Sequence, residues 1–500
     1  MDLILTDRSF HYELEKLCRL FYPEEPIKVS EDGSLPQQPD ALLVFAGVEE
    51  QNAQTLLTAW VRSGGQKHRA QAVYVPEKYG DTGPERQLAE LLYGLLVQQT
   101  GFTPRWGILT GVRPVKLLRS LAEQYGAEKA RQVFSQAYHV SAAKTRLAQL
   151  TMENERQLLQ RERPEGFSLY IGIPFCPSRC AYCSFVSMTV EKTIGMIPEY
   201  VACLCREIEA AGKTARDCGL TLQSVYMGGG TPTTLTPEQM DRVLGTVQTS
   251  FDLSACLEFT VEAGRPDTVT REKMDGLRRR GVTRVSINPQ TMQERVLEAI
   301  GRRHTVQQVL DAFQIARDAG FADMNMDLIA GLPLDTPETF ADTVNRVCAL
   351  EPESITVHTL ALKRSSAIFQ EGRQRASGAT AAQMLDYAGP KLLNSGYQPY
   401  YLYRQTRILG GLENVGFAKP GYESFYNAAI MDESQTILAC GAGAGSKVCD
   451  PSGSGKLERV YNFKYPYEYI SRHGEVLARK EKVKQIYEQY TAHGVCPLSK

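Results

Sequence analysis

The chain has 500 residues, of which 43% are hydrophobic and 23% charged, and its 56 basic and 57 acidic side chains give a formal net charge of −1. This length exceeds what one hydrophobic core serves, so two or three domains are expected. The balanced charge argues against a nucleic-acid partner, and no apolar stretch approaches the roughly 18 residues of a membrane span.

The cysteine content indicates a reducing environment. Of the twelve cysteines, nine are scattered and three are clustered, which does not fit a disulfide scaffold. The amino terminus, MDLILTDRSF, lacks the basic n-region of a secretory signal, and Asp7 breaks its apolar run. We therefore expect a cytoplasmic protein with one metal site.

Residues 1–104 are predicted to form a small N-terminal α/β domain. Three apolar runs predict strands at Leu3–Leu5, Ala41–Ala46 and Ala72–Val75, and leucines recur at helical spacing over Gln87–Val97. Residues 105–165 are expected to be a helical connector. Its helices should begin near Pro114, after the segment WGILTGVRP, where glycine and proline interrupt regular structure.

Residues 166–385 show a regular alternation of strand and helix patterns. Six apolar segments predict strands at Leu169–Ile173, Ser224–Met227, Leu257–Glu262, Arg284–Asn288, Asp323–Ile329 and Ile355–Leu360. The helix after the second strand should begin at a capping box formed by Thr236-Pro-Glu-Gln. The helix before the fifth strand should run from about Val306 to a stop at Gly320.

This alternation predicts parallel βαβ units in an α/β fold. Six strands favour an open or partial (β/α)6 barrel, and a doubly wound sheet is the alternative. In either architecture, functional residues gather at the carboxyl ends of the strands. Residues 386–500 are rich in tyrosine and glycine without this alternation, so we expect a C-terminal α+β extension that faces the substrate.

The most specific motif directly follows the first of these strands. In YIGIPFCPSRCAYC, Cys176, Cys180 and Cys183 place three thiols within eight residues. Iron–sulfur clusters take thiolate ligands, and three protein ligands for four irons leave one iron open to a small chelating molecule. Arg179 lies between the cysteines, where its positive charge would partly offset that of the cluster and its thiolates. We therefore expect a 4Fe-4S cluster on these three cysteines.

A structural zinc site is the main alternative, because zinc also takes thiolate ligands. Such a site normally needs a fourth ligand at matching spacing. The nearest candidates, Cys203 and Cys205, are two residues apart on a predicted helix and therefore point roughly 200° away from each other. They cannot both bind the same ion, which favours the cluster.

The second strand ends in a glycine run. Gly228, Gly229 and Gly230 precede Thr231, and glycines allow the backbone to approach a ligand closely. A tight turn is the alternative interpretation of the run on its own. The position of the run, one strand after the cysteines, favours a ligand.

Polar residues at the ends of later strands are further candidates. Glu262 ends the third strand, Gln290 follows the fourth, and Asp327 lies in the fifth between apolar neighbours, where a buried carboxylate needs a hydrogen-bonding partner. They could converge on hydroxyl and amino groups of a ligand, although Glu262 could equally be a solvated charge. Arg302 and Arg303 supply guanidinium groups suited to a carboxylate, and the sequence does not decide which of them points inward.

The C-x3-C-x2-C spacing, with an aromatic residue directly before the last cysteine, resembles that of the radical S-adenosylmethionine (SAM) superfamily. The resemblance implies that the open iron chelates the amino and carboxylate groups of SAM. It also implies that one electron from the cluster cleaves SAM to methionine and a 5′-deoxyadenosyl radical. The cofactor then carries the difficult chemistry, while the protein positions it and excludes water.

A narrower resemblance extends over residues 168–450. The motifs LYIGIPFCPSRCAYC, GGGTPT, VEAGRPD, RVSINPQ, GRRH and NMDLIAGLP occur in the order seen in oxygen-independent coproporphyrinogen III oxidases. The segment WGILTGVRP and the long extension around it resemble the coproporphyrinogen dehydrogenase (HemZ) branch of that family. The resemblance implies an oxidoreductase of porphyrin and heme biosynthesis. Its reaction would convert two propionates of coproporphyrinogen III to vinyl groups, giving protoporphyrinogen IX.

The same resemblance implies the cofactor contacts and the partners. The residues implied to contact SAM are Tyr170, Tyr182, Gly228, Gly229, Gly230, Thr231, Glu262, Gln290, Arg302, Arg303 and Asp327. One or two SAM molecules are implied, because a Phe-Gln pair that the oxidases associate with a second molecule aligns here with Phe425-Tyr426. The implied partners are a porphyrinogen, an electron donor and an electron acceptor. No catalytic residue beyond the cluster and cofactor contacts is assigned.

A heme chaperone, or another heme-handling radical SAM protein, is the alternative function. Phe185 occupies the position where the oxidases carry a further cysteine, and the chaperone branch shares this phenylalanine. The chaperone signature His-Asn-x-x-Tyr-Trp is missing, however, because the corresponding region reads Ser424-Phe-Tyr-Asn427. The motifs therefore favour the dehydrogenase.

Overall fold

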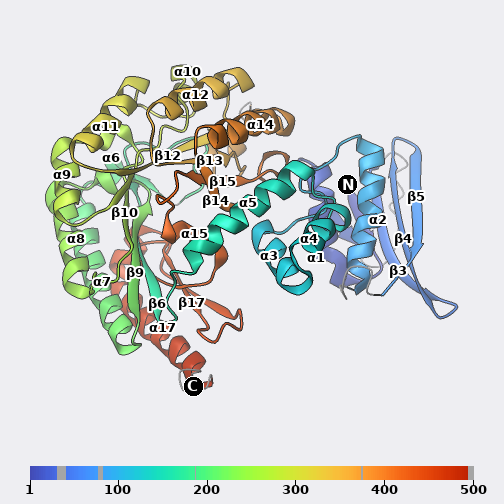
Figure 1. Ribbon diagram of the computed structural model, residues 1–500, viewed down its shortest axis with the longest axis horizontal. Helices are drawn as coiled ribbons and strands as arrows, with labels where there is room; N and C mark the ends of the chain where they lie inside the picture. The colour runs from blue at the N-terminus through green and yellow to red at the C-terminus, as the bar shows by residue number, and fades with distance from the viewer. Residues whose placement is uncertain (31–40, 77–82, 186, 373–374, 494–500) are drawn as a thin grey trace. The chain divides into compact units, whose positions relative to one another are not determined.

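The computed structural model describes residues 1–30, 41–76, 83–185, 187–372 and 375–493. The chain divides into two compact units. The first comprises Met1–Met152 and Tyr403–Glu413, and the second comprises Glu153–Leu402 and Asn414–Lys500 (Figure 1).

The first unit contains a five-stranded mixed sheet in the order β2-β1-β3-β4-β5. Its strands are β1 Asp2–Leu5, β2 Lys28–Ser30, β3 Leu43–Gln51, β4 Gln54–Ser63 and β5 Gln66–Val73. Helices α1 His11–Phe21 and α2 Gly83–Thr100 share one hydrophobic core with this sheet. The strands β1 and β3 and the helix α2 confirm the sequence predictions for this region.

The hairpin of β3 and β4 was not predicted. Asn52 and Ala53, between the two strands, both have positive φ, as a two-residue type I′ turn requires. Alanine at such a position is uncommon, so the turn lacks the Asn-Gly pattern that would indicate a hairpin. The predicted strand Ala72–Val75 is also corrected, because β5 starts at Gln66 and ends at Val73.

The predicted helical connector begins at Pro114, as expected. It consists of α3 Pro114–Tyr125, α4 Ala127–Gln132, a π-helical turn Val133–Ala137, and α5 Ala142–Leu159. Within the first unit, the buried carboxylate of Glu413 accepts hydrogen bonds from the Trp106 indole, at 2.7 Å, and from Lys144. Trp106 opens the WGILTGVRP segment, so this buried contact anchors the segment to the connector helix α5.

The second unit is organised by an eleven-stranded sheet, in the order β14-β15-β13-β12-β11-β10-β9-β6-β16-β17-β18. Its centre contains the six predicted strands: β6 Gly166–Ile173, β9 Thr221–Gly229, β10 Glu258–Glu262, β11 Arg284–Ser286, β12 Asp323–Ala330 and β13 Ser354–Thr359. These six strands pair in parallel and in chain order. The predicted α/β fold with a parallel sheet is therefore confirmed.

The C-terminal residues extend this sheet at both edges. The additional strands are β14 Gln398–Tyr403, β15 Asn414–Ala418, β16 Thr436–Cys440, β17 Gly445–Cys449 and β18 Leu457–Tyr461. Strand β15 pairs antiparallel with β13, whereas β16 pairs in parallel with β6. The expected extension is thus continuous with the central sheet and brings C-terminal loops close to the ends of the six strands.

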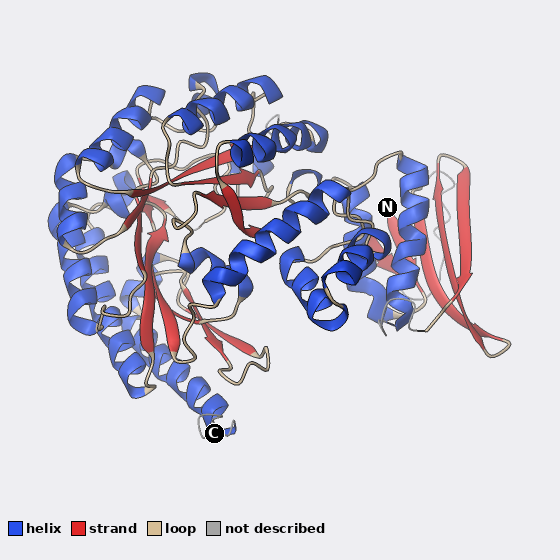
Figure 2. Cartoon of the chain, viewed as in Figure 1, coloured by secondary structure: helices blue, strands red, loops and turns tan. Residues whose placement is uncertain are grey.

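Helices connect the strands, and most of them cover the outer face of the sheet, whereas α15 Phe425–Asp432 lies on its inner side (Figure 2). They are α6 Val190–Thr193, α7 Ile197–Asp217, α8 Pro237–Ser250, α9 Arg271–Arg279, α10 Glu294–Ala299, α11 Val306–Asp318, α12 Pro337–Ala349, α13 Ala367–Gln370, α14 Gly378–Asn394, α15 Phe425–Asp432, α16 Pro466–Ser471 and α17 His473–His493. The capping box predicted at Thr236 is present, and α11 starts at Val306 as predicted. None of the described helices has the length and apolar character needed to cross a membrane.

Candidate active site

The three clustered cysteines lie in the loop after β6. Cys176 belongs to the short strand β7 Phe175–Cys176, which pairs in parallel with β8 Met188–Thr189. The backbone N–H of Cys183 donates to the carbonyl of Cys180 at 3.1 Å, so the loop turns tightly between them. Burial raises the pKa of the Cys176 and Cys183 thiols, and Cys180 raises both further. The three thiols therefore lie within electrostatic reach of one another.

A single-ion site is the alternative to a cluster at these thiols. No group of three or more His, Cys, Asp or Glu side chains within the described ranges is close enough to hold one metal ion. In a cubane cluster each thiolate binds a different iron, so its ligands lie further apart than those of one zinc ion. The half-buried cysteines at a strand end fit such a cluster.

The glycine run packs directly against the cysteine loop. The N–H of Gly230 donates to the carbonyl of Ile173 at 2.7 Å, and the Thr231 hydroxyl lies 3.5 Å from the Cys176 sulfur. A Cβ atom at Gly230 would lie 3.0 Å from that sulfur and 2.7 Å from the Phe175 carbonyl oxygen. Only glycine fits there, so the run is required for the backbone to approach the cysteine loop.

Glu262 ends β10 on the other side of this run. A Cβ atom at Gly228 would lie 2.8 Å from the Glu262 carboxyl carbon. The Tyr226 hydroxyl donates to Glu262 Oε1 at 2.6 Å. Burial, opposed by the hydrogen bond from Tyr226 and assisted by the nearby Asp327, raises the pKa of Glu262 to about 7. Near neutral pH, this carboxyl can therefore both donate and accept hydrogen bonds.

Three tyrosines form a stack beside Glu262. The register of β6, β9 and β10 places Tyr170 opposite Tyr226, and Tyr226 opposite Thr260. The ring centroids of Tyr170 and Tyr226 are 6.4 Å apart, and those of Tyr226 and Tyr426 are 4.5 Å apart. Tyr426 comes from α15, so a C-terminal helix contributes to the interior of the site. Neither Tyr226 nor Tyr426 was predicted to lie beside Glu262.

Asp327, in β12, is the second partly buried carboxyl of the site. Its Oδ1 accepts a hydrogen bond from the Asn325 amide at 2.8 Å, and His358 Nε2 lies 3.7 Å from its Oδ2. Burial alone would raise the pKa of Asp327, but His358 and the hydrogen bonds from Asn325 and Thr356 outweigh it and hold the pKa below its ordinary value. The site thus combines one ionised carboxylate with one that titrates near neutrality, an arrangement suited to distinct hydrogen-bonding roles.

Gln290 follows β11 and adopts a strained backbone conformation, with φ of 67°. Its N–H donates to the Asp327 carbonyl at 2.9 Å, and its own carbonyl accepts from the N–H of Ile329 at 3.0 Å. The side-chain oxygen of Gln290 is buried and has no hydrogen-bond partner. Because buried polar atoms are normally paired, this oxygen is available to a ligand.

Arg302 is the inward-facing member of the arginine pair. Its Nη1 donates to the Asn288 carbonyl at 2.5 Å, and its Nη2 donates to the Tyr182 hydroxyl at 3.1 Å. Its Nε is buried without a partner and is thus a second polar atom available to a ligand. Arg303 is exposed, and both arginines are among the residues that line a cavity bordered by the cysteine loop.

The structure changes the expectation for the charge near the cysteines. Arg179 is exposed, and its Nη2 donates to the Ser365 carbonyl at 3.0 Å. Arg265, in the loop after β10, is instead buried, with its Nη1 3.8 Å from the Cys180 sulfur. Sequence analysis did not single out Arg265, because no strand or helix periodicity marks a loop residue.

A cavity of about 420 Å³ opens beside these groups. Tyr170, Gly229 and Gly230 line it on one side, and Ala442 and Tyr461 line it on the other. Its remaining lining residues include Phe185, which is 68% exposed, and Lys464. The cavity gives a ligand bound at the strand ends access from solvent.

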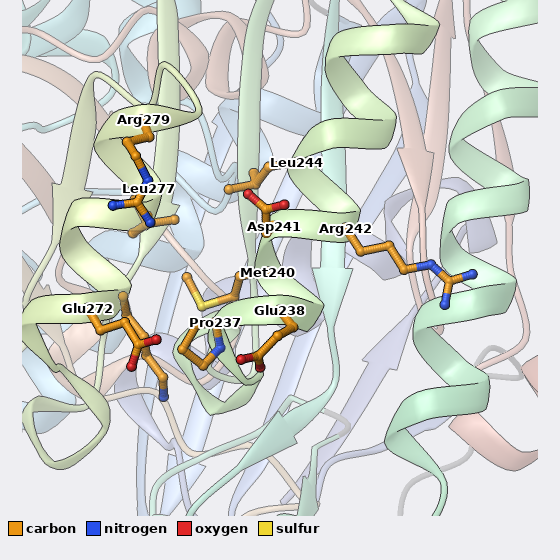
Figure 3. Close-up of a pocket in the computed structure, with 11 residues that line it drawn as sticks. Pro237, Glu238, Met240, Asp241, Arg242, Leu244, Glu272, Leu277 and Arg279 are labelled. Carbon is orange, nitrogen blue, oxygen red and sulfur yellow. The ribbon is translucent and has the colours of Figure 1, made fainter.

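A second cavity, of about 310 Å³, lies between α8 and α9 in the outer helical layer (Figure 3). Met240, Leu244 and Leu277 form its apolar part, and Asp241 and Glu272 are among its polar lining residues. None of the predicted site residues lines it. This cavity is therefore separate from the candidate active site.

The sequence matches the Radical SAM superfamily over residues 170–347. The *Bacillus subtilis* protein named oxygen-independent coproporphyrinogen-III oxidase-like protein HemZ is 36% identical over 97% of this chain and 98% of its own length. The heme chaperone HemW of the same organism is 33% identical, over 55% of this chain and 70% of its own.

A solved structure shows the same likeness in three dimensions. The *Escherichia coli* coproporphyrinogen III oxidase HemN, described as a radical SAM enzyme, superposes with a TM-score of 0.51 at 25% identity. The match covers 64% of this chain and 71% of that one. Together with the full-length match to HemZ, this shows that the chain belongs to the HemZ-type, coproporphyrinogen III oxidase-like family of the radical SAM superfamily.

Proposed function

We propose that this protein catalyses the oxygen-independent oxidative decarboxylation of coproporphyrinogen III to protoporphyrinogen IX. The convergence of three thiols with unpaired, buried polar atoms of Gln290 and Arg302 at one sheet edge supports the radical chemistry. The full-length similarity to HemZ supports the substrate class. The six parallel strands would form the partial (β/α)6 barrel typical of the superfamily.

Cys176, Cys180 and Cys183 would bind a 4Fe-4S cluster, which membership of the superfamily implies together with SAM. When bound, the cluster and SAM would supply one-electron radical chemistry that can remove a hydrogen atom from a substrate propionate. The donor set fits this assignment, because the cysteine loop supplies three thiols and leaves the fourth iron to a chelating ligand.

The remaining site residues would hold SAM. The backbone of Gly228–Gly230 and Thr231 would receive its amino group, and the free Nε of Arg302 would donate to its carboxylate. Tyr182 would position Arg302 through the hydrogen bond between them. Arg303 is exposed whereas Arg302 is buried, so Arg302 is the arginine that we retain for this role.

Glu262, Gln290 and Asp327 would bind the hydroxyl and amino groups of the adenosyl part. The ionised Asp327 accepts hydrogen bonds, and Glu262 can donate or accept them, because its pKa lies near 7. Tyr170 would form a wall of the cavity that admits the substrate. Tyr426 stacks on Tyr226, so the aligned Phe425-Tyr426 pair already has protein contacts, which favours one SAM molecule over two.

The test is an anaerobic reaction of the reconstituted full chain with coproporphyrinogen III, SAM and dithionite. We expect protoporphyrinogen IX and 5′-deoxyadenosine, and neither in the Cys176→Ala variant. A reconstituted protein that forms no more of either product than this variant would rule out the proposed reaction. An electron acceptor is added in parallel reactions, because each decarboxylation releases an electron.

Heme binding is the rival function, supported by the similarity to HemW and by the exposed Phe185 in the cysteine loop. A heme titration followed by the Soret band distinguishes the two. Stable binding of one heme per chain without porphyrinogen turnover would favour the chaperone role over the oxidase role.

A further inference from the structure

Arg265 makes contacts that connect β10 to the cysteine loop. It is 3% exposed and follows Glu262 by three residues. Its Nη1 donates to the Ser178 carbonyl at 3.2 Å and lies 3.8 Å from the Cys180 sulfur. Its Nη2 donates to the Ser178 hydroxyl at 3.0 Å. The guanidinium therefore contacts both a thiol ligand of the proposed cluster and the backbone beside it.

A second buried guanidinium acts on the same cysteine. Arg302 is 8% exposed, and Cys180 is among the groups that raise its pKa, although burial opposes the shift. The Arg265 guanidinium is paired with Asp267, at 3.2 Å from Nε and 3.3 Å from Nη2. The guanidinium groups of Arg265 and Arg302 and the carboxylate of Asp267 thus lie on the Cys180 side of the loop. The charges of these three groups sum to one positive charge.

The neighbouring His304 reports the same cationic environment. It is 2% exposed, and both of its ring nitrogens are buried without partners. Burial, together with the charges of Arg302 and Arg265, lowers the pKa of His304 to about 3, although Asp267 opposes the shift. The histidine is therefore neutral and leaves the positive charge near Cys180 to the two arginines.

A positive charge beside a cluster thiolate has a defined physical consequence. Reduction adds one negative charge to an iron–sulfur cluster, and a buried cation that hydrogen-bonds a ligand sulfur stabilises the reduced state. The effect is larger in a buried site than at the surface, because the effective dielectric constant is lower. Hydrogen bonds to sulfur and local charge are therefore the features by which a protein sets a cluster potential.

We infer that Arg265 raises the reduction potential of the cluster by donating to Cys180, which makes it easier for the external donor to reduce. The inference rests on the proposed binding of the cluster by the three cysteines. Arg265 acts through Cys180 and touches no reacting atom, so it is a positioning and tuning residue. Arg179 directly precedes Cys180 in the sequence, but it is exposed and its Nη2 donates to the Ser365 carbonyl, so we expect solvent to screen its charge.

The experiment compares midpoint potentials of anaerobically reconstituted full-length proteins, measured by redox titrations with electron paramagnetic resonance. At the wild-type midpoint, we expect the ratio of reduced to oxidised cluster to fall about tenfold in Arg265→Gln, which corresponds to about 59 mV for one electron. Arg265→Lys, which keeps the charge, should change this ratio less. The exposed control Arg179→Gln should leave the ratio within about twofold of the wild-type value.

If the wild-type protein contained no iron and sulfide, the proposed cluster itself would be overturned. This outcome is distinct from failure of the inference about Arg265, which requires a protein that holds a cluster. A cluster-loaded Arg265→Gln whose ratio stays within twofold of wild type would overturn the role of Arg265. If Arg265→Gln does not retain a cluster, the Asp267→Asn variant provides the test of the inference instead. Removing the carboxylate that offsets Arg265 should raise the reduced fraction, and an unchanged or lower fraction would overturn the inference.

Discussion

Two buried polar regions of the second unit differ in how completely their atoms are paired. Around Glu207, in α7, both carboxylate oxygens are fully used: Tyr469 and the N–H of Gly441 donate to one, and Asn462 and Lys480 contact the other. At the strand ends, by contrast, Gln290 Oε1 and Arg302 Nε are buried without partners. In the first region the protein itself supplies every hydrogen-bond partner, whereas the second region leaves polar atoms available to a ligand.

This difference separates a structural network from a binding site. A buried charge that meets all its partners within the chain fixes the local fold, here the loop from Gly441 that reaches the cavity beside the glycine run. Buried atoms without partners cost free energy unless a ligand pairs with them. The first prediction below therefore tests loss of stability in the first region, and the others test ionisation and ligand binding in the second.

The largest effect is expected for Lys480→Met. This change leaves the Glu207 carboxylate, which is 0% exposed, without its buried counterion 2.7 Å away. Breaking a buried ion pair on one side costs about 3–5 kcal/mol, so the free energy of unfolding should fall by that amount in chemical denaturation. The control is Lys484→Met in the same helix, whose partner Asp217 is partly exposed, so that its loss should reduce the stability far less. Equal losses for both variants would contradict the comparison.

Glu262→Gln should instead stabilise the protein without ligand above neutral pH. The pKa of Glu262 is raised from its ordinary 4.5 to about 7, so the folded state favours the protonated form. That contribution is complete below pH 4.5 and is lost as the pH rises through 7. Above pH 7, the variant should exceed the wild type by up to about 3 kcal/mol, measured by unfolding at a series of pH values. Parallel stability curves for the two proteins would argue against a titrating Glu262.

Arg302→Met should weaken SAM binding with little change in stability of the cluster. Removing a charged donor costs about 1.5–3 kcal/mol, which corresponds to an affinity about 10- to 100-fold lower. Arg303→Met is the matched control, because that neighbouring arginine is exposed. Calorimetric titration of both reconstituted variants with SAM gives the comparison. A larger effect at position 303 would reverse the assignment.

Tyr226→Phe should have the smallest effect. It removes the hydrogen bond of 2.6 Å to Glu262 while keeping the ring stack with Tyr170 and Tyr426. We expect SAM affinity to fall by about 0.5–1.5 kcal/mol and the pKa of Glu262 to rise, because the hydroxyl lowers it. Tyr426→Phe keeps that hydrogen bond and should bind SAM like the wild type. An equal loss in both variants would argue against a specific role for the hydrogen bond between Tyr226 and Glu262.

The sequence allowed the central part of this architecture to be predicted. All six parallel strands were located, because each combines a short apolar run with flanking helix signals such as the capping box at Thr236. The β3–β4 hairpin was missed, since its Asn52-Ala53 turn uses alanine where glycine is the usual signal. The Gly64-Gly65 turn of the next hairpin did carry that signal, with both residues at positive φ, and could have located β4 and β5.

Residues of the candidate site also differ in whether the sequence alone allowed them to be predicted. The cysteines, the glycine run and the carboxyls are marked by motif spacing or by their position at a strand end. Arg265 lies 85 residues from Cys180 in sequence, and Tyr426 lies in a C-terminal helix, so only the fold brings them to the site. Which of Arg302 and Arg303 is buried likewise depends on how the loop after α10 turns. Two adjacent arginines in a sequence do not indicate that turn.

The most direct test of the central claim is electron paramagnetic resonance of the reduced, anaerobically reconstituted protein with and without SAM, together with iron and sulfide analysis. We predict about four irons and four sulfides per chain and a spectrum that changes when SAM is added, because one iron has no protein ligand. A spectrum that SAM leaves unchanged, or a metal content that survives replacement of all three cysteines by alanine, would contradict it.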